Sequence, residues 1–188
     1  MTTNSLTFEQ ALAKLATVHN SAERIAVMQI VASAQDPRGI EPMIRALSYN
    51  DAGLFEVVVS GLIAIGEPAV QPILDCIDAM DYGARYQAFR ALVGVGDSRP
   101  RNSYAHWLKA DIAPSVRRIC VKGLGQFEDT LDLLLEALKD ADWSVRYCAV
   151  LVLGQRQHQS GVRTTLEALK EDPERTVRLK LAQVLEAS

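Results

Sequence analysis

The stretch VRRICVKGLG at residues 116–125 returns as VRYCAVLVLG at residues 145–154, and this repetition decides the fold. Weaker versions of the same phrase occur elsewhere along the chain. Together the phrases begin at residues 23, 54, 84, 116, 145 and 177, so the step between them is 29 to 32 residues. Self-similarity at such a period is typical of stacked supersecondary units, each of which buries its apolar face against its neighbours.

Each step holds two helical stretches joined by a polar turn. In the fifth unit, whose phrase begins at residue 145, these are residues 130–139 and residues 145–153, with the turn between them. Apolar residues of the second stretch recur at the spacing of one helix face. No stretch alternates with period two for long enough to indicate a strand. We therefore predict an all-α protein, a right-handed α-solenoid of about six HEAT-like helical hairpins, forming a single domain over residues 1–188.

Aspartates and glycines mark the ends of the second helices. An aspartate that is expected to cap free backbone N–H groups stands before five of them, at Asp51, Asp81, Asp111, Asp142 and Asp172. Glycines that are expected to adopt a left-handed conformation stand where four of them end, at Gly66, Gly96, Gly125 and Gly154. Charged residues dispersed through the last helix predict a polar cap on the stack.

Composition excludes several classes of protein. The chain has 188 residues, of which 48% are apolar, and this is enough for one continuous core. A net charge of −3 argues against nucleic acid as a partner. No apolar run is long enough to span a membrane. Residues 1–5 lack the basic and apolar regions of a secretory signal, and we expect a cytoplasmic protein.

The motifs of common active sites do not occur. There is no phosphate-binding glycine loop, no nucleophile elbow and no H-E-x-x-H motif. No metal site is predicted, because the histidines lie in three different units, at His19, His106 and His158. Three cysteines at apolar helical positions are expected to be reduced and buried, namely Cys76, Cys120 and Cys148.

An arginine occupies the same place in five of the six units. These arginines are Arg24, Arg85, Arg117, Arg146 and Arg178, and Phe55 stands in the remaining unit. An aspartate lies six residues before three of them, at Asp111, Asp140 and Asp172. An acid in one inter-helix turn can pair with the arginine of the adjacent unit. We therefore interpret most of this repeated slot as a structural ladder that sets the geometry of the stack.

Four polar or aromatic neighbours of the slot are not required by the repeat. They are Tyr86, Arg90, Arg118 and Tyr147, all on second helices, which line the usual binding surface of such solenoids. The arginines are suited to hold carboxylates through paired N–H donors, and the tyrosines to stack on a flat conjugated ligand. A solvated face with ordinary surface tyrosines explains the same residues equally well.

Two phrases carry a resemblance to a known family. The first is DYGARYQAFRAL at residues 81–92, and the second is APSVRR at residues 113–118, followed by KGLG at residues 122–125. In this order they resemble the E/F-type phycobilin lyases of cyanobacteria and red algae, and in particular the shorter F-type (β) subunit. The resemblance is specific over roughly residues 80–155, and the rest of the chain shares only the helical periodicity.

The resemblance implies an activity. F-type subunits pair with an E-type subunit, and the heterodimer attaches phycocyanobilin through a thioether to a cysteine of the phycocyanin α subunit. An isomerising F-type subunit carries an N-H-C motif, which this chain lacks, so plain attachment is expected. Phycocyanobilin would be the substrate, and no cofactor is expected. The bilin is expected to bind Arg85, Tyr86, Arg90, Arg117, Arg118 and Tyr147, and Asp81 is a candidate acid for the pyrrole nitrogens.

A second interpretation remains open at this point. A HEAT-type stack without catalytic activity can act as an adaptor, or as an assembly or degradation factor of the phycobilisome, by binding a protein through its second helices. The two interpretations differ in whether the chain binds bilin and promotes its transfer.

Overall fold

A computed structural model describes residues 6–187, and every regular element in that range is a helix. Its contacts divide it into two compact units, and the division in the chain falls between Arg99 and Pro100. The N-terminal unit contains α1 (Phe8–Leu15), α2 (Ser21–Ser33), α3 (Ile40–Ala46), α4 (Ala52–Ile65), α5 (Val70–Cys76) and α6 (Tyr82–Val95). The C-terminal unit contains α7 (Arg101–Ala110), α8 (Pro114–Leu124), α9 (Leu131–Ala137), α10 (Trp143–Gly154), α11 (Val162–Glu167) and α12 (Arg175–Glu186).

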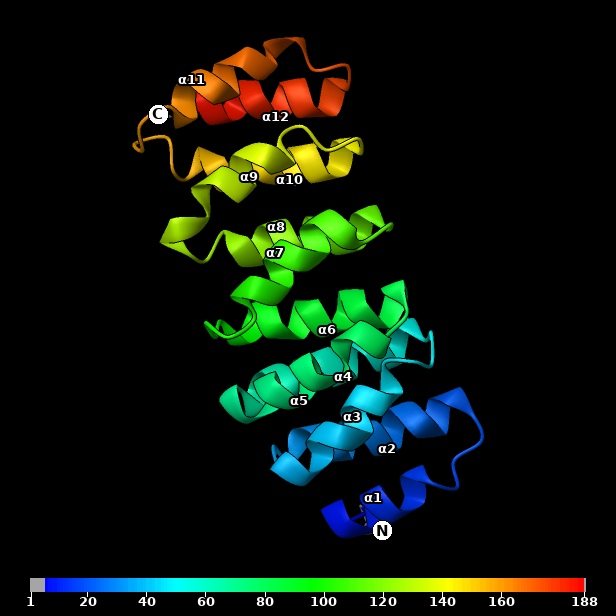
Figure 1. Cartoon of the computed structure of the whole chain (residues 1–188). Coiled ribbons are helices and arrows are strands. Elements are labelled where there is room, and N and C mark those ends of the chain that lie inside the picture. The colour runs from blue at the N-terminus through cyan, green and yellow to red at the C-terminus, as the bar shows by residue number, and fades with distance from the viewer. Residues whose placement is uncertain (1–5, 188) are drawn as a thin grey trace. The chain divides into compact units, whose positions relative to one another are not determined.

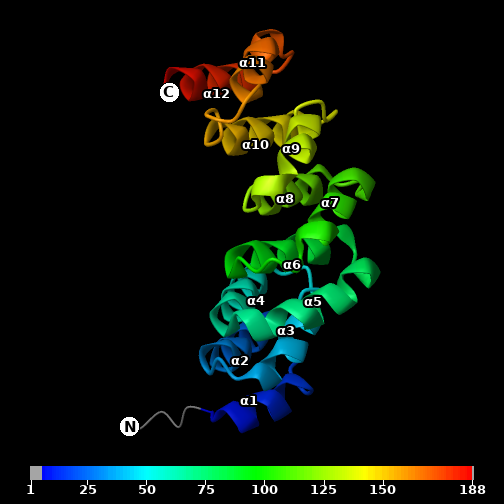
Figure 2. The same ribbon diagram turned by 60° about the vertical axis from the view of Figure 1, so that its left-hand side comes forward.

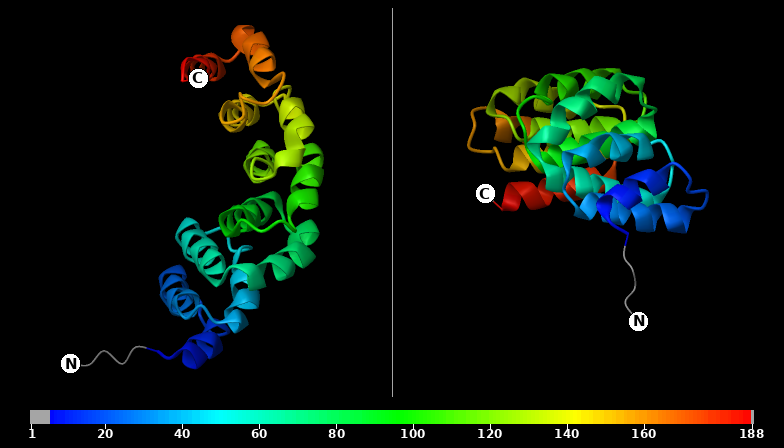
Figure 3. Two further views of the ribbon diagram at one scale, coloured as in Figure 1. Left: turned by 90° about the vertical axis from the view of Figure 1, so that its left-hand side faces the viewer. Right: turned by 90° about the horizontal axis from the view of Figure 1, so that it is seen from below.

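Both units are stacks of helical hairpins, which confirms the predicted all-α solenoid class (Figure 1). Within each unit the second helices form one layer and the first helices form the other (Figures 2 and 3). α4 packs between α2 and α6 in the N-terminal unit, and α10 packs between α8 and α12 in the C-terminal unit. The single domain over residues 1–188 and the right hand of the superhelix stay predictions. Residues 1–5, where we expected no secretory signal, lie outside the described range.

The core of each unit lies between its two layers of helices. Leu54 and Leu62 of α4 and Leu92 of α6 are almost fully buried in the N-terminal unit, as are Leu124 of α8 and Leu153 of α10 in the C-terminal unit. Burying one such side chain stabilises the fold by about 1.5–3 kcal/mol relative to leaving it exposed. The apolar positions that define the sequence repeat are therefore the positions that hold the hairpins together.

The predicted helix caps are confirmed at three of five aspartates. Asp51, Asp81 and Asp142 are N-caps, and each side chain accepts a hydrogen bond from an N–H in the first turn. The prediction is wrong for Asp111 and Asp172, because α8 and α12 begin two residues later than expected. Both carboxylates instead accept the N–H two residues ahead within the turn.

The expected left-handed conformation is found at Gly96, which ends α6 with φ of 74° and ψ of 25°. Gly66 at the end of α4 also has a positive φ, 79°, but its ψ of −135° lies outside the left-handed helical region. Gly125 and Gly154 do not have positive φ, so that expectation is wrong for them. Glycine stands at these two positions because a neighbouring helix approaches closely. A Cβ atom at Gly125 would lie 2.7 Å from a methyl of Val152, and one at Gly154 would lie 2.7 Å from a methyl of Val184.

The cysteines are only partly as expected. Cys120 and Cys148 are buried, whereas Cys76 is exposed, which corrects the prediction that all three are buried. Cys76 is the last residue of α5, where the apolar face of that helix ends.

None of the described helices is by itself both long and apolar enough to cross a membrane. α4 and the segment Glu67–Ala79 pass that test only as a pair, and the chain bends by 115° between them.

Candidate functional site

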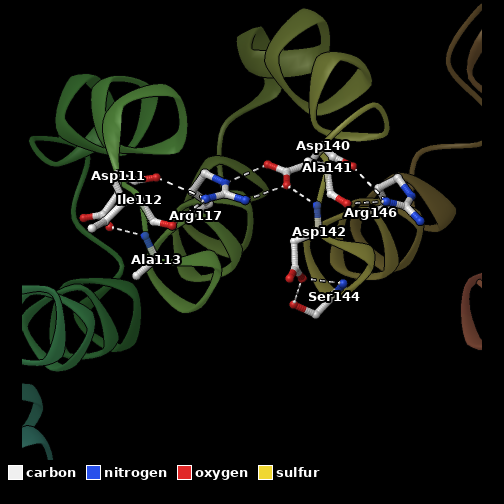
Figure 4. A network of polar contacts seen from close by, with 9 residues as sticks. All are labelled: Asp111, Ile112, Ala113, Arg117, Asp140, Ala141, Asp142, Ser144 and Arg146. Carbon is white, nitrogen blue, oxygen red and sulfur yellow. Dashed lines mark hydrogen bonds and ion pairs between the residues drawn. The ribbon is translucent and has the colours of Figure 1, made fainter.

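The repeated arginines of the C-terminal unit form a ladder with aspartates of the following hairpin, and Figure 4 shows the pair Arg117 and Asp140. Arg117 donates two hydrogen bonds of 2.8 Å to the two carboxylate oxygens of Asp140. Arg146 grips Asp172 in the same way, at 2.7 and 2.9 Å. Each arginine also donates to the backbone carbonyls five and six residues before it. This confirms the structural interpretation of the slot in this unit.

The ladder pairs are well buried. The side chains of Arg146 and Asp172 are 11% and 2% exposed, and those of Arg117 and Asp140 are 15% and 12% exposed. Hydrogen bonds from Arg146 hold the pKa of Asp172 below its ordinary value. The forks of both arginines are therefore occupied by protein carboxylates, as expected for pairs that fix the spacing of hairpins.

Two arginines at the repeated position, Arg85 and Arg117, were predicted to bind bilin, and both already donate hydrogen bonds to groups of the protein. Arg117 holds Asp140 as described, and Arg85 is 9% exposed and donates to the backbone carbonyls of Ile77 and Met80. Their role toward bilin stays a prediction. Asp81, the candidate acid, caps α6 through a 2.8 Å hydrogen bond from the N–H of Ala84, and it is exposed to solvent.

In the N-terminal unit, the structure brings Tyr86 and Arg90 together one helical turn apart on α6. We did not expect a structural partner for Arg90, but its guanidinium donates to both carboxylate oxygens of Glu56 on α4, at 2.8 and 3.1 Å. The pKa of Glu56 is lowered by this contact. Glu56 is 66% exposed, and pairs this open to water contribute little to stability.

In the C-terminal unit, residues one and five positions after a ladder arginine form a second-helix stripe. They are Arg118, Lys122, Tyr147, Leu151, Leu179 and Gln183, and we call them the basic–aromatic stripe. Positions four residues apart lie on one face of a helix, and α10 packs directly between α8 and α12. The structure thus places two predicted site residues, Arg118 and Tyr147, on neighbouring helices of one surface.

The charge of this stripe is not compensated by acids. Arg118 and Lys122 are exposed, and neither forms an ion pair with any residue between 6 and 187. Lys180, beside the stripe, places its Nζ atom 5.8 Å from the centre of the Tyr147 ring. Leu151 and Leu179 add apolar surface and are 37% and 55% exposed. The arrangement suits an anionic ligand with a flat apolar body.

The lysines were missed by the sequence interpretation. Lys122 follows Arg118 by four residues, and helical periodicity alone would have placed the two on one face. Lys180 gave no such signal. The equivalent positions in the preceding second helices are Ile119 and Cys148, which are buried, so the repeat predicts an inward side chain there.

A thiol lies directly beneath the stripe. Cys148 is 4% exposed, and its Sγ atom lies 3.5 Å from the backbone oxygen of Arg118. Burial raises the pKa of this thiol to about 11, against smaller opposite effects of Lys122 and Arg118. The thiol therefore stays protonated near neutral pH and is a poor nucleophile.

Comparison with known proteins supports the fold and shows which family the chain is similar to. The family model for HEAT repeats matches residues 105–186. The phycocyanobilin lyase subunit beta of Pseudanabaena tenuis is 40% identical over 67% of this chain, and the aligned part spans 50% of that protein. The protein of the same name from Thermosynechococcus vestitus is 33% identical over 80% of this chain and 77% of its own length.

A solved structure is also similar. It is the complex of CpcE and CpcF of phycocyanin lyase from Nostoc sp. PCC7120, which matches with a TM-score of 0.74 and 30% sequence identity. The match covers 79% of this chain and 99% of the matched chain.

Proposed function

Because the chain belongs to the family of the phycocyanobilin lyase β subunits, we propose that it is one subunit of a heterodimeric phycobilin lyase. The complex would attach phycocyanobilin to a cysteine of the phycocyanin α subunit through a thioether. The partner would be an E-type subunit, as in the similar solved complex. The reaction would take place in the cytoplasm, and no resident cofactor would be needed.

The observation that carries this proposal is the basic–aromatic stripe of the C-terminal unit. Phycocyanobilin is a linear, conjugated tetrapyrrole with two propionates, so it combines a flat apolar body with two negative charges. Arg118 and Lys122 offer two uncompensated cations one helical turn apart. Tyr147 and the exposed leucines offer a surface for the conjugated body. A ligand of this kind can use both the charged and the apolar part of the surface.

The main role of the lyase in this reaction would be to orient the bilin and the acceptor cysteine. The cysteine thiolate of the phycobiliprotein adds to the ethylidene carbon of the bilin, so a C–S bond forms and a C=C bond becomes single. The proton that the thiol loses returns to the bilin π-system. No nucleophile on the lyase is required, and holding one bilin conformer before one cysteine accelerates the addition. Asp81 as an acid for the pyrrole nitrogens, and Arg85, Tyr86, Arg90 and Arg117 as bilin contacts, stay separate predictions that the stripe does not require.

The buried Cys148 supports the same proposal. A lyase must not become the acceptor of its own substrate, and a reactive thiol below the bilin would compete with the phycobiliprotein cysteine. The raised pKa of Cys148 and its 4% exposure keep it from adding to the bilin.

The test is reconstitution with purified components. The chain, an E-type subunit, phycocyanobilin and apo-phycocyanin α subunit are mixed, and covalent attachment is read as bilin fluorescence that survives denaturing electrophoresis. We expect attachment only when both lyase subunits are present. Attachment at the spontaneous rate with both subunits present would contradict the proposal. Attachment by this chain alone would contradict the need for a partner.

A further inference from the structure

The N-terminal unit contains a cavity that has no part in the proposed bilin site. It has a volume of about 400 Å³ and lies among α1, α2 and α3. Its lining is partly apolar, from side chains that include Leu12, Leu15 and Met28. Two arginines, Arg24 and Arg45, complete it, and none of the described residues in its lining is acidic. A volume of this size is within the usual range for small-molecule sites.

Arg24 holds the ladder position of the first hairpin but has no carboxylate. One of its nitrogens donates to the backbone oxygen of Val18 at 3.2 Å, and its guanidinium carbon lies 4.3 Å from the centre of the Tyr49 ring. The acid nearby in the next turn is Asp51. That carboxylate accepts hydrogen bonds from the hydroxyl of Ser21 and the N–H of Leu54, and it forms no ion pair with Arg24 among the described residues.

The equivalent groove of the C-terminal unit shows what normally occupies this place. It lies between α7 and α9, has a volume of about 530 Å³ and is lined by Arg117 at the matching position. There Asp140 fills the arginine fork, and Lys109 bridges to Glu136 across the groove at 3.2 Å. Positive and negative side chains are balanced in that groove, whereas the cavity at Arg24 carries only positive ones.

The charge of Arg45 is not neutralised by a buried acid among the described residues. Arg45 pairs with Glu41 at 3.0 Å on the surface, where both side chains are mostly exposed, so water screens this pair. The cavity therefore combines apolar walls with two cations, Arg24 and Arg45, and Arg24 stands at a position that binds a carboxylate elsewhere in the same chain.

We propose that this cavity binds a small monocarboxylate with an apolar chain. The carboxylate would take the free donors of Arg24, as Asp140 takes those of Arg117, and the chain would lie among Leu12, Leu15 and Met28. The inference does not depend on the lyase activity, because the cavity is lined only by residues between Leu12 and Tyr49 and its test requires no bilin.

The test uses octanoate as the probe and octan-1-ol as its neutral counterpart, titrated into the full chain by calorimetry or NMR. We expect octanoate to bind at least about tenfold more tightly than octan-1-ol, because a charge-assisted hydrogen bond contributes on that scale. Arg24→Gln should weaken octanoate binding by about ten- to a hundredfold and leave octan-1-ol unchanged. Arg163→Gln, an exposed arginine of the other unit, is the matched control and should change neither.

A second variant covers the case in which Arg24→Gln does not fold. Ala16 is exposed and lines the cavity, so Ala16→Phe should obstruct the cavity without removing a charge. It should weaken octanoate binding by at least about tenfold. Equal affinity for octanoate and octan-1-ol, or unchanged octanoate binding in Ala16→Phe, would overturn the proposal.

Discussion

The two units solve the same stacking problem with different contacts. In the C-terminal unit, Arg117 and Arg146 reach the next hairpin and grip an aspartate two residues before its helix cap. In the N-terminal unit the same pair of positions holds Arg24 and Tyr49, which make a cation–π contact. The following hairpin has Phe55 in place of the arginine. The repeat thus accepts a cation–π contact at this position and does not require an ion pair.

The largest expected effect is the loss of a buried ionic contact. Asp172→Ala leaves the guanidinium of Arg146 largely buried without its carboxylate, and the free energy of unfolding should fall by roughly 3 kcal/mol. Tyr49→Ala at the matching position should cost only about 1 kcal/mol, because Tyr49 is 50% exposed. Urea denaturation of both variants measures the difference. Similar losses in the two would show that the ionic contact has no special weight.

The second largest effect is expected in phycocyanobilin affinity, which should depend more on the C-terminal unit than on the N-terminal unit. Arg118→Ala or Lys122→Ala should weaken phycocyanobilin binding by roughly 1.5–3 kcal/mol, or about ten- to a hundredfold. Arg90→Ala should have a smaller effect, because Glu56 already occupies that guanidinium. The readout is bilin affinity from the visible absorption band, with the melting temperature of each variant as the control for folding. A larger loss for Arg90→Ala would place the bilin on the N-terminal unit instead.

Acidification should loosen the C-terminal unit through its ladder. The folded-state pKa of Asp172 lies below the ordinary value of 3.8, so its stabilising effect is present above that value. The effect is lost as the pH falls through the lower, folded-state pKa. The melting temperature of Asp172→Asn should therefore fall less steeply than that of the natural chain below about pH 4. Tyr49→Phe is the control and should leave the slope unchanged.

The smallest expected effects concern the thiols. In the native protein at pH 8, Cys76 of the N-terminal unit should react with iodoacetamide, whereas Cys148 should be protected by burial and its raised pKa. Mass spectrometry of the alkylated peptides gives both rates. Replacing any of the three cysteines by serine should leave bilin attachment largely intact. Loss of attachment with an unchanged melting temperature would instead indicate a transient bilin adduct on that cysteine.

The repeat predicted the fold well because its signal is periodic. Helical spacing and short polar turns predicted the second helix of each hairpin. The aspartates six residues before an arginine predicted the ladder. Cap positions shifted where α8 and α12 begin late, since propensity does not show where the next hairpin packs. The close approaches at Gly125 and Gly154 and the outward turn of Lys180 depend on contacts between hairpins, which residue spacing does not contain.

Asp140 takes part in two rungs of the ladder at once. Its carboxylate holds Arg117, its backbone oxygen accepts a 2.8 Å hydrogen bond from Arg146, and its Oδ1 atom also accepts the N–H of Asp142. Opening either rung therefore disturbs the other. Neighbouring hairpins of the C-terminal unit should open cooperatively, as one segment in hydrogen exchange. The hairpins of the N-terminal unit, which have no such shared residue at Tyr49, should exchange more independently of one another.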